Sequence, residues 1–71
     1  MGVVRRYRDE QRRVIWVATD RQRWHVWWGT DGGPYQHEWP ADETATRELV
    51  AGLRHRDGGT WRDITTQPGP G

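Results

Sequence analysis

Three histidines are the side chains best suited to acid–base catalysis or metal binding, because imidazole titrates near neutral pH. They stand at positions 25, 37 and 55. The strand and helix pattern described below places His25 on one face of a sheet, His37 on the opposite face and His55 at the end of a helix. Side chains distributed in this way cannot converge on one metal ion, so we expect no metal site.

Nucleophilic catalysis has equally little support, since the sequence contains neither cysteine nor serine. Threonine, the remaining aliphatic hydroxyl, has no evident histidine partner to activate it. The Gly-rich segment 30–34 is expected to join two strands and opens no helix, unlike a loop that cradles phosphate. We therefore expect a protein that is not an enzyme and that uses no cofactor.

Arginine and tryptophan are the residues whose chemistry favours binding. All 11 basic side chains are arginine, and six tryptophans occur in 71 residues. A guanidinium binds phosphate, a guanine edge or carboxylate through two parallel hydrogen bonds. An indole offers a flat surface on which a base or an apolar side chain can pack. Together these residue types indicate a binding surface.

The length allows one domain, which we expect over residues 1–65, followed by a disordered tail over residues 66–71. Charge is unevenly spread. Residues 1–30 carry seven arginines and three acids (+4), whereas residues 31–71 carry four arginines and seven acids (−3), which gives the net +1. There is no apolar run of membrane-spanning length, no signal-like segment and no cysteine, so we expect a cytoplasmic protein without membrane contact.

Runs of β-branched and aromatic residues predict four strands, over residues 3–8, 12–19, 24–29 and 35–39. Apolar residues at helical spacing then predict a helix over residues 42–56, which Gly58-Gly59 would end. Residues 61–65 could form a short fifth strand or an extended tail. The fold class is therefore α+β: a four-stranded antiparallel meander with one helix packed across one face.

The hairpin loops set the register of the sheet. A two-residue loop at residues 21–22 places Val17 opposite Val26, and a loop over residues 30–33 with Gly29 opposite Pro34 gathers large apolar groups on one face. The helix stripe of Ala45, Leu49 and Leu53 would cover this inner face, which is expected to contain Ile15, Val17, Trp24, Val26, Trp28, Tyr35 and Trp39.

The opposite, outer face then places Trp16 directly across from Trp27. The other residues expected on this face are Arg12, Val14, Ala18 and His25. The first strand adds either Arg5 and Tyr7 or Arg6 and Arg8, because its register is open. Two indoles among guanidiniums either form a contact surface or simply pair across the strands, which would stabilise the sheet by roughly 0.5–1.5 kcal/mol.

We expect a non-catalytic module that binds its partner through this outer face. The candidate residues are Arg5, Arg6, Arg8, Arg12, Arg13, Trp16, His25 and Trp27. Nucleic acid, DNA in particular, is preferred by a narrow margin as the ligand. The alternatives are a protein–protein interaction module (adaptor, inhibitor or antitoxin-like partner) and a homodimer formed by strand pairing.

Strands followed by a helix across the back, with arginine and tryptophan on the free face, resemble the sheet-reading AP2 domains and the arm-binding domains of phage integrases. The resemblance lies in architecture and in Arg/Trp usage, and it implies DNA contact through the sheet. The expected fourth strand departs from the three-stranded layout of those domains.

Overall fold

Three strands of eight residues form the body of the protein in the computed structural model, which describes residues 2–56 and 60–65. These are β1 (Gly2–Asp9), β2 (Arg13–Asp20) and β3 (Arg23–Thr30). They are followed by β4 (Tyr35–Glu38), α1 (Glu43–His55) and β5 (Trp61–Asp63). The tail predicted over residues 66–71 and the Gly58-Gly59 helix stop lie outside the described residues.

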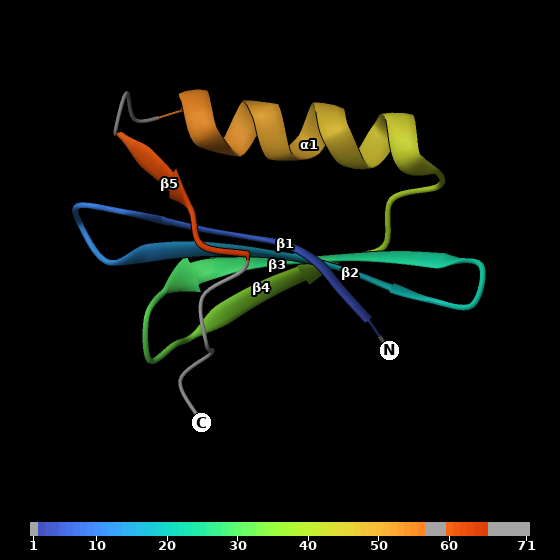
Figure 1. Cartoon of the computed structure of the whole chain (residues 1–71), viewed down its shortest axis with the longest axis horizontal. Helices are drawn as coiled ribbons and strands as arrows, with labels where there is room; N and C mark the ends of the chain where they lie inside the picture. Colours follow the sequence, from blue (N-terminus) through green and yellow to red (C-terminus); the bar gives the residue numbers. More distant parts are fainter. Residues whose placement is uncertain (1, 57–59, 66–71) are drawn as a thin grey trace.

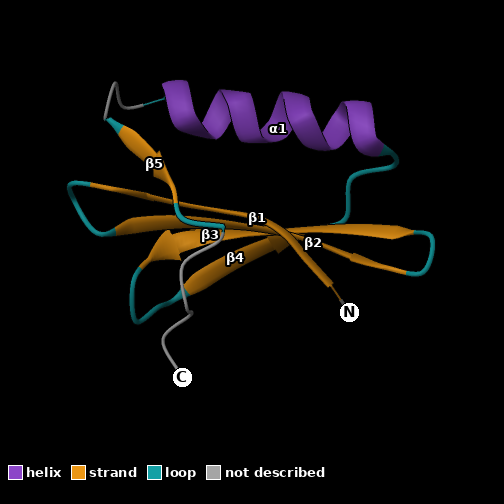
Figure 2. Ribbon diagram, in the orientation of Figure 1, coloured by secondary structure: helices purple, strands orange, loops and turns teal. Residues whose placement is uncertain are grey.

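The strands form one antiparallel sheet in the order β4-β3-β2-β1-β5. The first four strands make the predicted meander, and β5 pairs with β1 at the edge opposite β4. Figure 1 and Figure 2 show α1 lying across one face of this sheet. The α+β architecture is thus confirmed, and residues 61–63 form a fifth strand.

The β2–β3 hairpin has the predicted register. Asp20 pairs with Arg23 around a two-residue loop, and Val17 pairs with Val26. The inner face of this hairpin supplies the core residues Ile15, Val17 and Val26, which pack against Val50 and Leu53 of α1. The partly buried hydrophobic residues around this core are Tyr7, Trp24, Trp28, Leu49 and Trp61. Large aromatic rings therefore complete a small aliphatic core.

The helix presents a slightly different stripe from the predicted one. Thr46, Val50 and Leu53 are its buried residues, and Leu49 is only partly buried. Ala45 is half-buried, so the helix is turned by about one position relative to the expected stripe. The larger side chain of Val50 thereby fills the core in place of Ala45, which buries more apolar surface.

The start of α1 is defined by Asp42, whose side chain accepts a hydrogen bond from the Ala45 amide at 2.8 Å. This is the usual N-cap arrangement for a helix entered from an extended residue. Glu43 and Arg47, four residues apart on α1, form an ion pair at 3.1 Å. The helix has 13 residues, and the described part of the chain contains no helix long and apolar enough to cross a bilayer.

The register of β1, which the sequence left open, places alternate residues on different faces. Arg6 pairs with Trp16 and Arg8 with Val14, so both arginines lie on the outer face. Tyr7 lies on the inner face and packs against the core. A register shift between Val3 and Arg5 interrupts the ladder at the start of the strand. This alternation packs the phenol ring against the core and leaves the two guanidiniums near solvent.

The predicted register of β4 is wrong by one residue. Gly29 pairs with Tyr35 and not with Pro34, so Tyr35 moves to the outer face and Gln36 to the inner face. Proline has no N–H with which to enter the ladder, which disfavours the predicted pairing. A Cβ on Gly29 would collide with the carbonyl oxygen of Pro34, so the close approach of the two strands requires glycine.

The shift also explains why β4 does not follow the hydrophobic pattern used to predict it. Gln36 and Glu38 occupy its inner face and are exposed, which shows that this edge of the sheet lies outside the apolar core. Polar side chains are therefore stable there. The rings of β4 pack instead on the outer face, so Tyr35 and Trp39 are not core residues and His37 does not lie on the inner face.

Candidate binding surface

A row of side chains crosses the outer face of four neighbouring strands. Arg6 pairs with Trp16, Trp16 with Trp27, and Trp27 with His37. Cross-strand neighbours on one face are close enough for their side chains to touch. We call the rings on this face the outer aromatic surface; its members are Trp16, His25, Trp27, Tyr35, His37 and Trp39.

The rings of the outer aromatic surface pack on one another. Trp27 stacks on His37 with centroids 4.3 Å apart and planes at 15°. Trp39 also packs on His37, with ring centroids 4.1 Å apart and planes at 44°. Tyr35 reaches across the strands to Trp16, at a centroid distance of 5.2 Å. The surface is therefore a preformed aromatic layer whose rings hold each other in place.

His25 and His37 meet on this face, which corrects the expectation that they lie on opposite faces of the sheet. His25 Nδ1 and His37 Nε2 are 3.1 Å apart. Their centroids are 5.2 Å apart and their planes differ by 22°, so the rings meet edge to edge in a hydrogen bond. One nitrogen must donate and the other accept, so the lone pairs are not both available to a metal ion.

The surroundings of His37 favour the neutral form of its ring. Burial, and after it the proximity of His25, lowers the pKa of His37 below its ordinary value. His25 is buried, and its Nε2 has no hydrogen-bond partner among the described residues. Charging the His37 ring would place a cation beside a second imidazole in a partly dry environment. The described residues also contain no cluster of three or more metal-ligating side chains.

Exposure separates the rings a ligand could touch from those that support them. Trp39 is 60% exposed and Tyr35 is 39% exposed. Trp16 and Trp27 are half-buried, whereas His25 is 7% exposed and serves as packing beneath the others. Contact with a partner would therefore centre on Tyr35 and Trp39 and extend over the two indoles predicted from the sequence.

Three arginines border the outer aromatic surface on its β1–β5 side. Arg6 donates to the carbonyl oxygens of residues 64 and 65, at 3.4 Å each. Arg8 forms an ion pair with Asp31 at 3.2 Å. Arg62 pairs with Arg8 across β1 and β5, on the same face, and is exposed. Basic charge is thus concentrated along one edge of the rings.

The other predicted arginines lie elsewhere. Arg5 is on the inner side of β1, because it pairs with Val17. Arg12 was expected in a strand on the outer face, but it lies in the β1–β2 turn with φ of 65°. Arg13 forms an ion pair with the buried Asp9 at 2.5 Å and packs over Trp61 at 5.5 Å. Arg13 therefore has a structural role.

Sequence reasoning missed Tyr35, His37 and Trp39 because it favoured the neighbouring register of β4. Pro34 was the available signal, since a ladder pairing at proline is disfavoured. Arg62 was missed because residues 61–65 were left open between a strand and a tail. In the structure, the pairing of β5 with β1 places Arg62 beside Arg8.

Comparison of the chain with protein family models, with curated proteins and with solved structures gave no significant match.

Proposed function

We propose that the protein is a non-catalytic binding module whose outer aromatic surface binds single-stranded nucleic acid. The observation that carries this proposal is the cross-strand row from Arg6 through Trp16 and Trp27 to His37, with Tyr35 and Trp39 exposed beside it. Bases would stack on the exposed rings, and the arginines along β1 and β5 would contact phosphates. Stacking tolerates every base, so binding would depend weakly on sequence.

The width of the sheet favours an unpaired strand over a duplex. Neighbouring strands lie about 4.8 Å apart, so five strands span about 19 Å. The major groove of B-DNA is about 12 Å wide and admits a two-stranded ribbon or a helix. A five-stranded face with rings at one side and arginines at the other suits a single strand of nucleic acid, whose phosphate backbone and unpaired bases are both exposed.

Charge on this face supports a moderate affinity that depends on salt. Arg6, Arg8 and Arg62 could neutralise three phosphates, and Asp31 already pairs with Arg8. For single strands each neutralised phosphate contributes about −0.7 to the slope of log K against log salt. Three contacts therefore correspond to a slope of about −2.

Fluorescence anisotropy with a labelled oligothymidylate of about ten nucleotides, a length within the range such surfaces cover, tests the proposal. We expect saturable binding that is tighter than binding to a duplex of equal length. Tyr35→Ala combined with Trp39→Ala should weaken it by at least about tenfold, since each stacked base contributes about 1–3 kcal/mol. Arg56→Gln, an exposed change at the C-cap of α1, is the matched control and should leave affinity within about twofold. Absence of binding at low salt, or preference for the duplex, would contradict the proposal.

A second candidate is a protein partner, and the position of β4 favours it. β4 is the edge strand of the sheet, and the 60% exposed Trp39 follows it directly. An edge strand with an exposed indole could pair with a strand of another protein or of a second copy. Sedimentation velocity over a range of concentrations distinguishes self-association, which would be abolished by Trp39→Ala, from a monomer.

A further inference from the structure

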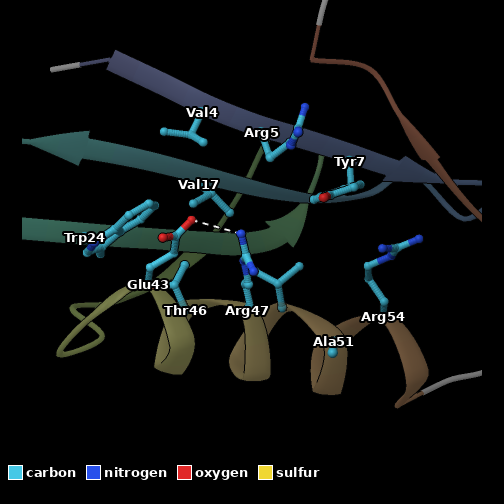
Figure 3. Close-up of a pocket in the computed structure, with 11 residues that line it drawn as sticks. Val4, Arg5, Tyr7, Val17, Trp24, Glu43, Thr46, Arg47, Ala51 and Arg54 are labelled. Atoms are coloured by element: carbon cyan, nitrogen blue, oxygen red, sulfur yellow. Dashed lines mark hydrogen bonds and ion pairs between the residues drawn. The ribbon is translucent and has the colours of Figure 1, made fainter.

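A groove lies between α1 and the inner side of β1 and β2, on the face of the sheet opposite the outer aromatic surface (Figure 3). Its volume is about 340 Å³, which is within the range of small-molecule sites. Arg5, one of the arginines predicted to bind a ligand on the outer face, lines this groove. The groove is therefore a separate place where that side chain could act.

The floor of the groove is apolar. It is formed by Val4, Tyr7, Val17, Trp24 and Val50. Val4 is 37% exposed. Tyr7 and Trp24 pack against the core but are only partly buried. The register shift of β1 between Val3 and Arg5 falls at Val4, one of the residues of this floor. An apolar body placed here would remove these side chains from water.

The rim of the groove is cationic. Arg5 stands on β1, and Arg47 and Arg54 stand two turns apart on the facing side of α1. Arg54 lies over the Tyr7 ring at 4.8 Å, and Glu43 is the one acidic residue that lines the groove. Three guanidiniums around one carboxylate leave an excess of positive charge at the rim.

The existing ion pairs leave the positive charge of the rim arginines available to a ligand. Arg47 pairs with Glu43 at 3.1 Å, but their side chains are 79% and 58% exposed. Arg5 reaches Asp63 only at 3.9 Å, also in solvent. Exposed pairs of this kind contribute little and exchange readily for a ligand. Both arginines can therefore turn toward an anion in the groove.

Ala51 provides space between the two helix arginines. It follows Arg47 by four residues and precedes Arg54 by three, so all three lie on one side of α1. Its methyl group leaves the gap between the guanidiniums open, and Figure 3 shows it in the row of helix residues beside Arg54. Trp24 lies at the opposite end of that row from Arg54.

We propose that this groove binds a small organic anion, a carboxylate or phosphate group attached to a short apolar body. The acid group would lie above Ala51, within reach of Arg5, Arg47 and Arg54, which bind carboxylate and phosphate through paired hydrogen bonds. The apolar body would extend over Val4 toward Trp24. The groove combines an apolar lining with a few convergent polar groups, as small-molecule sites generally do.

NMR titration of the full chain with octanoate and with phenyl phosphate tests this assignment. Six indole N–H signals are available, and we expect Trp24 to shift saturably while Trp39 does not. Octanol supplies the apolar body without charge and inorganic phosphate supplies charge without the body; each should bind at least about tenfold more weakly than the corresponding anion. The relative affinity of the two anions shows which acid group the arginines prefer.

Three variants test whether the anion binds in this groove. Ala51→Leu should fill the gap and weaken binding at least about tenfold, whereas Thr44→Leu, an exposed helix change outside the groove, should have no effect. Glu43→Gln should tighten binding about two- to fivefold, because it removes the negative charge and frees Arg47. Circular dichroism of each variant verifies the fold.

The proposal is overturned if inorganic phosphate reproduces the shifts, if octanol binds as well as octanoate, or if Ala51→Leu leaves the affinity unchanged. None of these outcomes depends on the outer aromatic surface, because the groove lies on the opposite face. An oligonucleotide that shifts Trp39 and an anion that shifts Trp24 would therefore be separate results.

Discussion

The indole of Trp27 stacks on the imidazole of His37, with ring centroids 4.3 Å apart. The same imidazole shares a hydrogen bond with the ring of His25. This relationship ties β3 to β4 on the outer face of the sheet. It also means that the outer rings stabilise each other before any partner binds. A surface held in place in this way loses less side-chain entropy on binding than free indoles would.

Two tryptophans should respond differently to truncation because they lie on different faces. Trp28 packs against the core, so Trp28→Ala should lower the free energy of unfolding by about 3 kcal/mol or more. Trp39 is 60% exposed, so Trp39→Ala should lower it by less than about 1 kcal/mol. Urea unfolding followed by circular dichroism measures both values. A larger loss for Trp39→Ala would show that the two faces have been assigned wrongly.

Two glycine substitutions should change the free energy of unfolding in opposite directions. A Cβ at Gly29 meets the Pro34 carbonyl oxygen and the Tyr35 ring, so Gly29→Ala should destabilise the protein by about 1–3 kcal/mol. Gly52 lies in α1 with no atom near its missing Cβ, so Gly52→Ala should stabilise it by about 0.5–1 kcal/mol. Thermal denaturation of both variants provides the comparison. Equal effects of the two changes would argue against the observed β3–β4 register.

Stability should fall as the pH drops below neutrality, because the pKa of His37 is lowered by burial and by His25. The folded protein then binds fewer protons at this site than the unfolded chain, whose histidine has a pKa of about 6.5. The contribution of His37 to stability is complete above the unfolded pKa. It is lost as the pH falls from the unfolded pKa toward the lower pKa of the folded protein. Denaturant titrations at pH values on either side of about 6.5 measure the slope of the unfolding free energy against pH. His37→Gln should reduce this slope, and an unchanged slope would assign the effect to other groups.

Asp9 should be important for stability although it is charged. Its buried carboxylate accepts hydrogen bonds from the amides of Gln11 and Arg13 at 3.0 and 2.8 Å, and it pairs with the Arg13 guanidinium. Breaking such a pair leaves a charge without its partner, so Asp9→Ala should destabilise by about 3–5 kcal/mol. Arg12→Gln, in the same turn but exposed, should change stability by less than about 0.5 kcal/mol. Denaturant melts of the two variants distinguish them, and similar losses would contradict a special role for Asp9.

The β2–β3 register could be predicted from sequence because both of its faces carry clear signals. A two-residue loop leaves one pairing, and that pairing separates Val17 and Val26 from Trp16 and Trp27. A shift of one residue would have moved every side chain to the other face. The helix could also be predicted, since the spacing of apolar residues is a local property, although its buried stripe differs by about one position from the expected one.

The β4 register could not be predicted by the same reasoning, because the hydrophobic pattern was applied to an edge strand outside the core. Tyr35 and Trp39 were assigned to the inner face as apolar residues, but they pack on other rings of the outer face. The groove beside α1 was also beyond prediction, since Arg5 and Arg47 come together only through the tertiary packing of helix and sheet.

The six indole N–H signals offer the most direct test of the central claim, because the structure divides them equally between the two faces. Trp16, Trp27 and Trp39 lie on the outer face, and the inner signals belong to Trp24, Trp28 and Trp61. Titration with an oligothymidylate of about ten nucleotides at low salt should shift the outer three and leave the inner three in place. Shifts confined to the inner indoles, or no shift of any indole, would contradict the assignment of the outer aromatic surface as a nucleic-acid site.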